Sequence, residues 1–548
     1  MATTALALGE SNAPARHSGL HRPFHPGARW AFLAVLLGGL AYAGVSVATD
    51  TAHVGETLAI GSFLFLGLAL LIALGFEFVN GFHDTANAVA TVIYTHSMPA
   101  PLAVVWSGVF NFLGVILSSG AVAYSIVTLL PVELVLHVGS AGGFSMIFAL
   151  LLAAVVWNLA TWFVGLPNSS SHALIGSILG VGLANQLLSA GGDGANGVDW
   201  AQAQKVLTTL LISPLIGFVG AMLLLFVMKR VLPNPKLYTA PEDGAPPPKG
   251  IRALLIFTCT AVSFAHGGND GQKGMGLIML ILIGCAPTAY ALNRTVPQSA
   301  TPAFVQSATA ATAAFDAHAT GAAKPGVDAA RQTLTDAIKA KKADGAPVYA
   351  ALAGVSRDVT TRIGGYGSLG QVPAAATQNL RNDMYLVLDT TKLMTTDTVK
   401  NSPLTAPEKT AIKAYAGKLE EGTRYIPTWV KVTVALALGL GTMVGWKRIV
   451  VTVGERIGKT HLTYGMGASA ELMAAATILM AERFGMPVST THILSSGVAG
   501  ASVANGAGLQ VRTVRNMALA WVLTLPAAML LAGGLYWLLL SVVKAAGL

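Results

Sequence analysis

The chain has 548 residues, of which 53% are hydrophobic and only 11% charged, whereas about a quarter of residues are charged in a typical soluble domain. This composition excludes an ordinary soluble protein and indicates an all-α protein that crosses a bilayer several times. Lys and Arg outnumber Asp and Glu by 34 to 25, but they cluster in short loops between apolar runs. That pattern predicts cytoplasmic loops rather than nucleic-acid binding. Two cysteines in apolar segments imply no disulfide framework.

The first half of the chain begins with a polar tail, predicted over residues 1–28, and an additional membrane helix within residues 29–57. The apolar run there is too long for the core of a signal peptide. A first transmembrane repeat is expected over residues 58–228. Residues 229–251 follow as a basic loop, which we expect on the cytoplasmic side.

A second repeat is expected to begin at residues 252–293 and to resume at 426–548, with a polar insertion at 294–425 between the two parts. Within the insertion, Asp328–Lys342 and Pro407–Glu421 have helical composition, and Thr405 with Glu408 forms a helix-start signal. A single crossing by Thr428–Trp446 separates the insertion from the basic residues after it. This predicts a small helical subdomain or cap on the periplasmic side.

Two similar segments place acidic residues at the end of, or inside, apolar runs. Gly81–Asn87 is matched by Gly267–Lys273, with Asp84 and Asp270 lying 186 positions apart. Ionisable residues at membrane depth mark ion or substrate pathways, although a solvated helix end would be the simpler explanation for one copy. The glycines in both copies predict broken helices. Residues expected to bind or couple a cation or proton are His83, Asp84, Asn87, Asn269, Asp270, Glu77 and Glu471.

A second pair of segments carries hydroxyl groups. Gly165–His172 is matched by Gly485–His492, and each reads as a loop that leads through Pro and consecutive hydroxyl residues into a helix N-terminus. Free N–H groups and the helix dipole suit such an end to an oxyanion, although simple N-capping is the alternative. The two histidines lie 320 positions apart, 134 more than the aspartates. The insertion accounts for this difference, which indicates a duplication.

These four segments resemble the motifs of the Pit-type inorganic phosphate transporter family, over roughly Leu58–Arg294 and Ile426–Leu548. The resemblance implies two inverted repeats with broken helices and re-entrant hydroxyl loops, in a multi-pass protein of the bacterial inner membrane. It implies import of inorganic phosphate by symport. Phosphate contacts are then expected from Ser169, Ser170, Ser171, Ser489, Thr490 and Thr491, together with Thr85, Gln272 and Lys273. His172 and His492 are expected either to relay protons or to orient the hydroxyl segments.

The chain departs from the family pattern at three positions: His83 and Lys273 stand where relatives carry Asn, and Ala90 stands where many relatives carry Gly before Thr91. Exchanging two amide ligands for a titratable ring and a cation favours proton coupling over sodium coupling. A neutral complex of phosphate with a metal ion is one expected form of the substrate. We expect no cofactor, no dedicated metal site and no enzymatic activity. The expected partners are phosphate, protons and lipid, and a homodimer is a further expectation.

Two other functions are compatible with the sequence. Sulfate shares tetrahedral geometry with phosphate, so hydroxyl groups and helix ends do not by themselves distinguish the two anions. A phosphate-sensing receptor would use the insertion as its output domain, and deleting the insertion should spare transport if the protein is a transporter.

Overall fold

The computed structural model describes residues 27–55, 60–127, 129, 140–188, 198, 200–241, 245–340, 342–395 and 403–546. These residues are almost entirely helical, and the one β-type pairing among them is an isolated bridge between Gly458 and Leu509. Eight of the described helices are long and apolar enough to cross a membrane. An all-α, multi-pass membrane protein is therefore confirmed. The side chains of two predicted site residues, Thr85 and Asn87, lie outside the described part of the chain.

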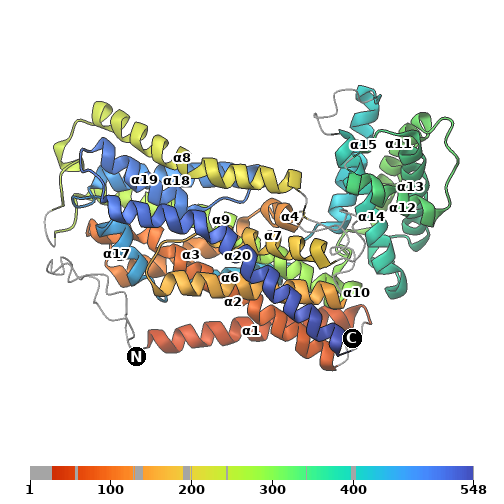
Figure 1. Cartoon of the computed structure of the whole chain (residues 1–548), viewed down its shortest axis with the longest axis horizontal. Helices are drawn as coiled ribbons and strands as arrows, with labels where there is room; N and C mark the ends of the chain where they lie inside the picture. Colours follow the sequence, from red (N-terminus) through yellow and green to blue (C-terminus); the bar gives the residue numbers. More distant parts are fainter. Residues whose placement is uncertain are drawn as a thin grey trace.

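Helix α1 (Ala28–His53) contains the apolar run that was expected to form an additional membrane helix. The first half of the membrane region comes after it in the chain. Figure 1 shows α1 along one edge of an elongated helical body. The helices of this half are α2 (Ile60–Tyr94), α3 (Ala100–Leu117), α4 (Ala121–Val127), α6 (Ala141–Phe163), α7 (Ser170–Leu188) and α8 (Trp200–Val231). A one-turn helix, η2 (Pro235–Leu237), lies in the basic loop that follows.

The second half repeats this succession of helices. Its members are α9 (Lys249–Cys285), with the short α10 (Pro287–Tyr290) after it, then α16 (Thr428–Gly441), α17 (Lys447–Glu455), α18 (Tyr464–Arg483), α19 (Thr490–Ala504) and α20 (Val511–Ala545). The halves exchange partners in a matched way. Helix α7 packs on α20 while α19 packs on α8, and α3 packs on α9 while α16 packs on α2. Each half therefore completes the core of the other.

Helix α16 is shorter than the crossing predicted over Thr428–Trp446, since it ends at Gly441. Its 14 residues span about 21 Å at 1.5 Å per residue, less than the hydrocarbon core of a bilayer. Gly441 packs directly against the backbone of Phe78 on α2. The helix is therefore buried against protein, where a span of full length is not required.

The predicted helix breaks at the acidic segments are wrong, because α2 and α9 both run without interruption through them. The glycines serve close packing instead. A Cβ at Gly267 would strike the backbone of Asn111, and one at Gly276 would lie 2.8 Å from the carbonyl oxygen of Ala123. Small residues of this kind let membrane helices approach closely while the helical hydrogen bonds stay intact.

Gly267→Ala is expected to destabilise the protein by about 1–3 kcal/mol, because the added methyl must push α3 away from α9. Gly250→Ala is the matched control, since nothing lies within 4 Å of a Cβ built at that position of the same helix. The apparent unfolding temperature of the purified protein should fall for the first variant and hold or rise for the second. Equal temperatures for both variants would contradict the packing role of Gly267.

The polar insertion forms a separate bundle of helices at one end of the membrane body (Figure 1). The bundle comprises α11 (Thr301–His318), α12 (Val327–Ala340), α13 (Ala346–Tyr366), α14 (Ala374–Thr395) and α15 (Ala406–Thr423), with the one-turn helices η3 (Gln298–Ala300) and η4 (Leu369–Gln371). The two helices predicted from sequence correspond to α12 and α15. The buried Asp383 ties three helices together by accepting from Arg331 at 2.7 Å and from Arg362 at 2.8 Å.

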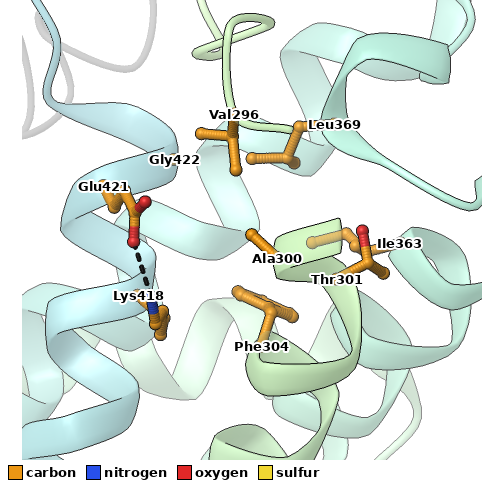
Figure 2. A pocket seen from close by; sticks show the side chains of 9 residues that line it. All are labelled: Val296, Ala300, Thr301, Phe304, Ile363, Leu369, Lys418, Glu421 and Gly422. Carbon is orange, nitrogen blue, oxygen red and sulfur yellow. Dashed lines mark hydrogen bonds and ion pairs between the residues drawn. The ribbon is translucent and has the colours of Figure 1, made fainter. Parts of the chain in front are cut away.

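Figure 2 shows a small pocket inside this bundle, between α11, α13 and α15. Its walls are mostly apolar, with Phe304, Ile363 and Leu369 among them. Its two charged side chains, Lys418 and Glu421, pair with each other at 2.8 Å. Because their charges are mutually compensated, this pocket has the character of a packing defect rather than of an anion site.

Helix α15 begins with a capping box, as predicted, in which Thr405 and Glu408 bond to each other's backbone N–H groups. The backbone and hydroxyl of Thr405, with His318 nearby, lower the pKa of Glu408 below its ordinary 4.5. A carboxyl group whose pKa is lowered in the folded state stabilises the fold at pH values above its ordinary pKa. This contribution disappears as the pH falls through the lowered pKa.

Glu408→Gln should therefore weaken hydrogen-exchange protection at the start of α15 at pH 7 and lose that difference well below pH 4.5. Thr405→Ala should destabilise the same turn by about 1 kcal/mol. A Glu408 effect of equal size at both pH values would show that its charge is not involved.

Candidate functional site

The two acidic segments meet in the interior because α2 packs directly on α9. Gly274 lies against Glu77, whereas His266 lies against Asp84. The residue number of the contact position on α9 thus falls as that on α2 rises, so the two helices run antiparallel. Asp84 is 3% exposed and Asp270 is fully buried. The segments that sequence analysis paired therefore face each other at one buried site.

The two hydroxyl segments, Ser169–Ser171 and Ser489–Thr491, lie at helix starts, as predicted. Helix α7 begins at Ser170 and α19 at Thr490. The hydroxyl of Ser169 accepts from the N–H of His172 at 3.1 Å, and that of Ser489 accepts from the N–H of His492 at 3.2 Å. The first hydroxyl of each segment is therefore an N-cap, whereas the later hydroxyl groups make other contacts; Ser171, for example, donates to the carbonyl of Val488 at 2.7 Å.

Asp84 receives hydroxyl groups from both halves of the protein. Ser170 donates to one carboxylate oxygen at 3.0 Å, and Thr491 donates a short hydrogen bond to the other. The Nδ1 atom of His83 lies 3.5 Å from the same carboxylate. Three helices, α2, α7 and α19, therefore converge on this single side chain.

Asp270 has a corresponding but different set of contacts. Lys273 places its Nζ 2.6 Å from the carboxylate and donates to Ser171 at 2.5 Å. Thr490 lies 3.5 Å from the same carboxylate, in the position that Ser170 takes at Asp84. The lysine is fully buried, and a buried cation of this kind requires a compensating anion. The pseudo-symmetry of the site is thus broken by one fixed positive charge.

His266 and Asn80 complete the cluster and were missed by the sequence analysis. The Nε2 atom of His266 lies 3.5 Å from Asp270 and 3.7 Å from Asp84, between the two carboxylates. The Oδ1 atom of Asn80 lies 2.6 Å from the hydroxyl of Ser170, so Asn80 and Asp84 share its single proton. Each residue precedes an aspartate by four positions, one helical turn, and the two are themselves 186 positions apart. Comparing the two acidic segments over one further helical turn toward the N-terminus would have found both residues.

The cluster has the donor set of a cation site. Ligand atoms of Asp84, His266 and Asp270 all lie within 4.8 Å of one another. Carboxylates with an imidazole can bind a divalent cation, and the same groups can hold a shared proton. The sequence analysis expected no dedicated metal site, whereas the structure brings the ligand atoms of these three residues together.

Some predicted residues lie beside this cluster rather than in it. Asn269 holds the loop before α19, donating to the carbonyl of Met486 at 3.1 Å. Gln272 accepts from the N–H of Val122 at the start of α4, at 2.8 Å. Glu77 is fully buried against Gly274, and its carboxylate has no hydrogen-bond partner among the described residues. Glu471 accepts from Thr258 at 2.5 Å.

The two predicted histidines of the hydroxyl segments lie together. The rings of His172 and His492 have centroids 4.5 Å apart, and His492 also stacks on Trp521 at 4.1 Å. The Nδ1 atom of His172 lies 2.9 Å from the capping hydroxyl of Ser169. These contacts orient the starts of α7 and α19 toward each other, so that two helix N-termini face the same space.

The chain is similar in sequence to known phosphate transporters. The Phosphate transporter family model matches residues 80–532. The chain is 42% identical over 512 residues to the low-affinity inorganic phosphate transporter PitA of Escherichia coli K12, covering 87% of this chain and 98% of that protein. It is 39% identical over 507 residues to PitB of the same organism, covering 89% and 99%.

A solved structure described as the sodium-dependent phosphate transporter superposes with a TM-score of 0.46 at 19% identity, covering 87% of this chain and 99% of that one. The family match alone extends over all four motifs and most of the membrane helices. The chain therefore belongs to the phosphate transporter family.

Proposed function

We propose that this protein imports inorganic phosphate across the bacterial inner membrane by cation symport, with protons as the driving ion. Membership of the family supports phosphate as the substrate, and both E. coli relatives are named as low-affinity inorganic phosphate transporters. The long apolar helices support a multi-pass membrane location.

One observation carries the proposal most directly: Asp84 is bonded at once by Ser170 of one half and Thr491 of the other. Phosphate oxygens would accept hydrogen bonds from the same hydroxyl groups and from the helix N-termini behind them. A phosphate ion and the carboxylate of Asp84 therefore compete for the same donors. Protonating Asp84 would release these donors, which couples proton binding to phosphate binding.

The nitrogen groups around the carboxylates favour protons over sodium. His83 and His266 lie beside Asp84, and the ammonium of Lys273 is 2.6 Å from Asp270. A sodium ion prefers oxygen ligands, whereas imidazole and ammonium nitrogens flank these carboxylates. Histidine, in contrast, accepts and releases protons near neutral pH. Glu77 and Glu471 would serve as further proton carriers on the way to and from the site.

Phosphate could enter as a neutral complex with a divalent metal. The metal would then be part of the substrate, and Asp84, His266 and Asp270 would supply its ligands. The hydroxyl segments Ser169–Ser171 and Ser489–Thr491 would hold the phosphate oxygens. The antiparallel aspartate helices support inverted repeats, and access would alternate as one half rocks against the other.

Proteoliposomes with separately imposed gradients test the coupling ion. An inward proton gradient without sodium should drive phosphate accumulation, and an inward sodium gradient at uniform pH should not. Accumulation driven by sodium alone would overturn proton coupling.

The same vesicles test the substrate. Arsenate should inhibit uptake of labelled phosphate because it matches phosphate in charge and geometry, whereas sulfate should not. Strong inhibition by sulfate would identify a less selective oxyanion permease.

A further inference from the structure

A groove lies on the outer surface of the membrane body, between α1, α2 and α16 and apart from the central site. It encloses about 210 Å³, and its described walls are apolar except at Thr433. The hydroxyl of Thr433 already donates to the carbonyl oxygens of Trp429 and Val430. Along α2 the groove extends from Leu71 to Phe78, about 10 Å at 1.5 Å per residue. One bilayer leaflet has about 15 Å of hydrocarbon, so the groove accommodates a large part of one acyl chain.

Glycine leaves this groove open on the side of α2. Gly75 lies in its wall, and a Cβ built there meets nothing within 4 Å. On the opposite wall, Gly39 of α1 lies close to α16, since a Cβ there would be 3.0 Å from Leu436. Helix α1 therefore packs on α16 and leaves space over α2. Inside a bilayer, the hydrocarbon chains of lipids are the apolar groups available to fill such space.

The first turn of α1 lies toward one end of the groove and carries a cation, Arg29. Helices α1 and α16 run antiparallel, because Asp50 accepts from Trp429 while Gly39 lies against Leu436. Arg29 comes ten residues before Gly39, about 15 Å further along α1. Helix α16 ends five residues after Leu436, at Gly441. Arg29 therefore lies near the level of the segment that follows α16.

That segment leads into α17, which begins with two more cations, Lys447 and Arg448. A row of edge-to-face ring contacts connects α1 through α2 to the end of α6, and it comprises Phe32, Phe78, Phe82 and Trp162. The guanidinium of Arg448 lies over the last of these rings, 5.1 Å from its centroid. The rings thus link the end of the groove at Phe78 to the basic start of α17.

The three cations at this end of the groove are exposed and lack a compensating carboxylate in the described part of the chain. Arg29 and Lys447 each lie over the ring of a neighbouring tryptophan, at 5.6 and 5.8 Å from its centroid. Arg448 donates to the carbonyl oxygen of Phe163. These contacts orient the side chains without neutralising them. An apolar groove that ends among basic residues is complementary to a lipid with a negatively charged headgroup.

A helix from a second copy of the chain is the alternative occupant of the groove. A helix with its side chains is about 10–12 Å across, which is too wide for a groove of about 210 Å³. Its apolar face would also bring no negative charge to the basic end. Free phosphate would match that charge but would leave the apolar groove empty. The lipid satisfies both features at once.

We propose that the groove between α1, α2 and α16 binds one anionic phospholipid of the bilayer. One acyl chain lies along Gly75, and the headgroup phosphate lies among Arg29, Lys447 and Arg448. The bound lipid fills the space between α1 and α2, and so holds the additional helix α1 against the membrane body. This lipid site is separate from the transport site and does not depend on the proposed function.

The test is native mass spectrometry of the full-length protein in detergent, titrated with phosphatidylglycerol or with phosphatidylcholine that has the same acyl chains. The unmodified protein should bind one phosphatidylglycerol about thirtyfold more tightly than phosphatidylcholine, because each of two basic residues contributes about fivefold. Arg29→Gln/Lys447→Gln should bind the two lipids with nearly equal affinity, since the headgroup preference depends on these charges.

The apolar part of the site is tested separately by filling the groove. Gly75→Leu should weaken the binding of both lipids about tenfold or more, because the new side chain occupies the space of the acyl chain. Gly67→Leu is the matched control, since a Cβ at Gly67 of the same helix also meets nothing within 4 Å and this residue does not line the groove. This control should bind both lipids as the unmodified protein does.

Equal affinities of the unmodified protein for the two lipids would overturn the proposal. So would a headgroup preference that persists in Arg29→Gln/Lys447→Gln, or a Gly75→Leu protein that binds phosphatidylglycerol as tightly as Gly67→Leu. Lipid-free dimers that disappear with Gly75→Leu would assign the groove to a second copy instead. If Gly75→Leu fails to assemble, the Arg29→Gln/Lys447→Gln protein decides, because both of its substitutions are at exposed positions.

Discussion

Asp84→Asn is expected to abolish phosphate uptake, by on the order of a hundredfold or more, while the protein remains folded in the membrane. The carboxylate accepts from Ser170 and Thr491 and lies beside His83 and His266. Asparagine has nearly the same volume, so packing is preserved. It cannot take up a proton or carry a negative charge, and its NH₂ group replaces one of the two oxygens that accept from these hydroxyl groups. One hydroxyl then loses its acceptor and the other loses a charged one, and a hydrogen bond to a charged group contributes about 1.5–3 kcal/mol.

Asp50→Asn provides the control for this variant. Asp50 is also an aspartate near the membrane helices, accepting from Tyr290 at 2.8 Å and from Trp429 at 3.1 Å. These contacts join α1 to α10 and α16, away from the central cluster, and an asparagine oxygen can still accept them. Uptake should stay within about twofold of the unmodified protein. Normal uptake by Asp84→Asn would remove this carboxylate from the mechanism.

Much of the architecture could be predicted because burial in a bilayer leaves a strong mark on sequence. A long apolar run identified helix α1, and the unequal spacing of Asp84/Asp270 and His172/His492 located the insertion. The starts of α7 and α19 followed from proline and hydroxyl residues at a helix N-terminus, where local chemistry decides the structure. These features depend on near neighbours in the chain.

The errors came from contacts between distant segments. Glycines at 267 and 276 looked like helix breakers, yet they contact Asn111 and Ala123 of neighbouring helices, and a single sequence does not reveal such neighbours. His266 was missed because its partners are Asp84 and Asp270, one of them on another helix. The exchange of partners between the halves, α7 with α20 and α19 with α8, was equally invisible, since it follows from packing rather than from any local pattern.

The buried pair Lys273–Asp270 yields the second large effect. Lys273→Met should destabilise the protein by about 3–5 kcal/mol, because it leaves Asp270 as an uncompensated charge in the interior. The double variant Lys273→Met/Asp270→Asn should recover most of that stability, since both charges are gone and methionine fills the space of the lysine stem. It should nevertheless transport no phosphate, because the site has lost one carboxylate and its only fixed cation among the described residues.

Lys418→Met gives the comparison within the same chain. Lys418 and Glu421 form an ion pair at 2.8 Å, as short as many buried pairs, but their side chains are 35% and 45% exposed. Water screens that pair, so its loss should cost less than about 1 kcal/mol. Apparent unfolding temperatures and uptake rates of all three variants separate the two roles of Lys273. A Lys273→Met protein as stable as Lys418→Met would show that Asp270 is neutral in the resting protein. Phosphate uptake by the double variant would show that transport requires neither charge, and the asymmetry between the two aspartate sites would then have no part in coupling.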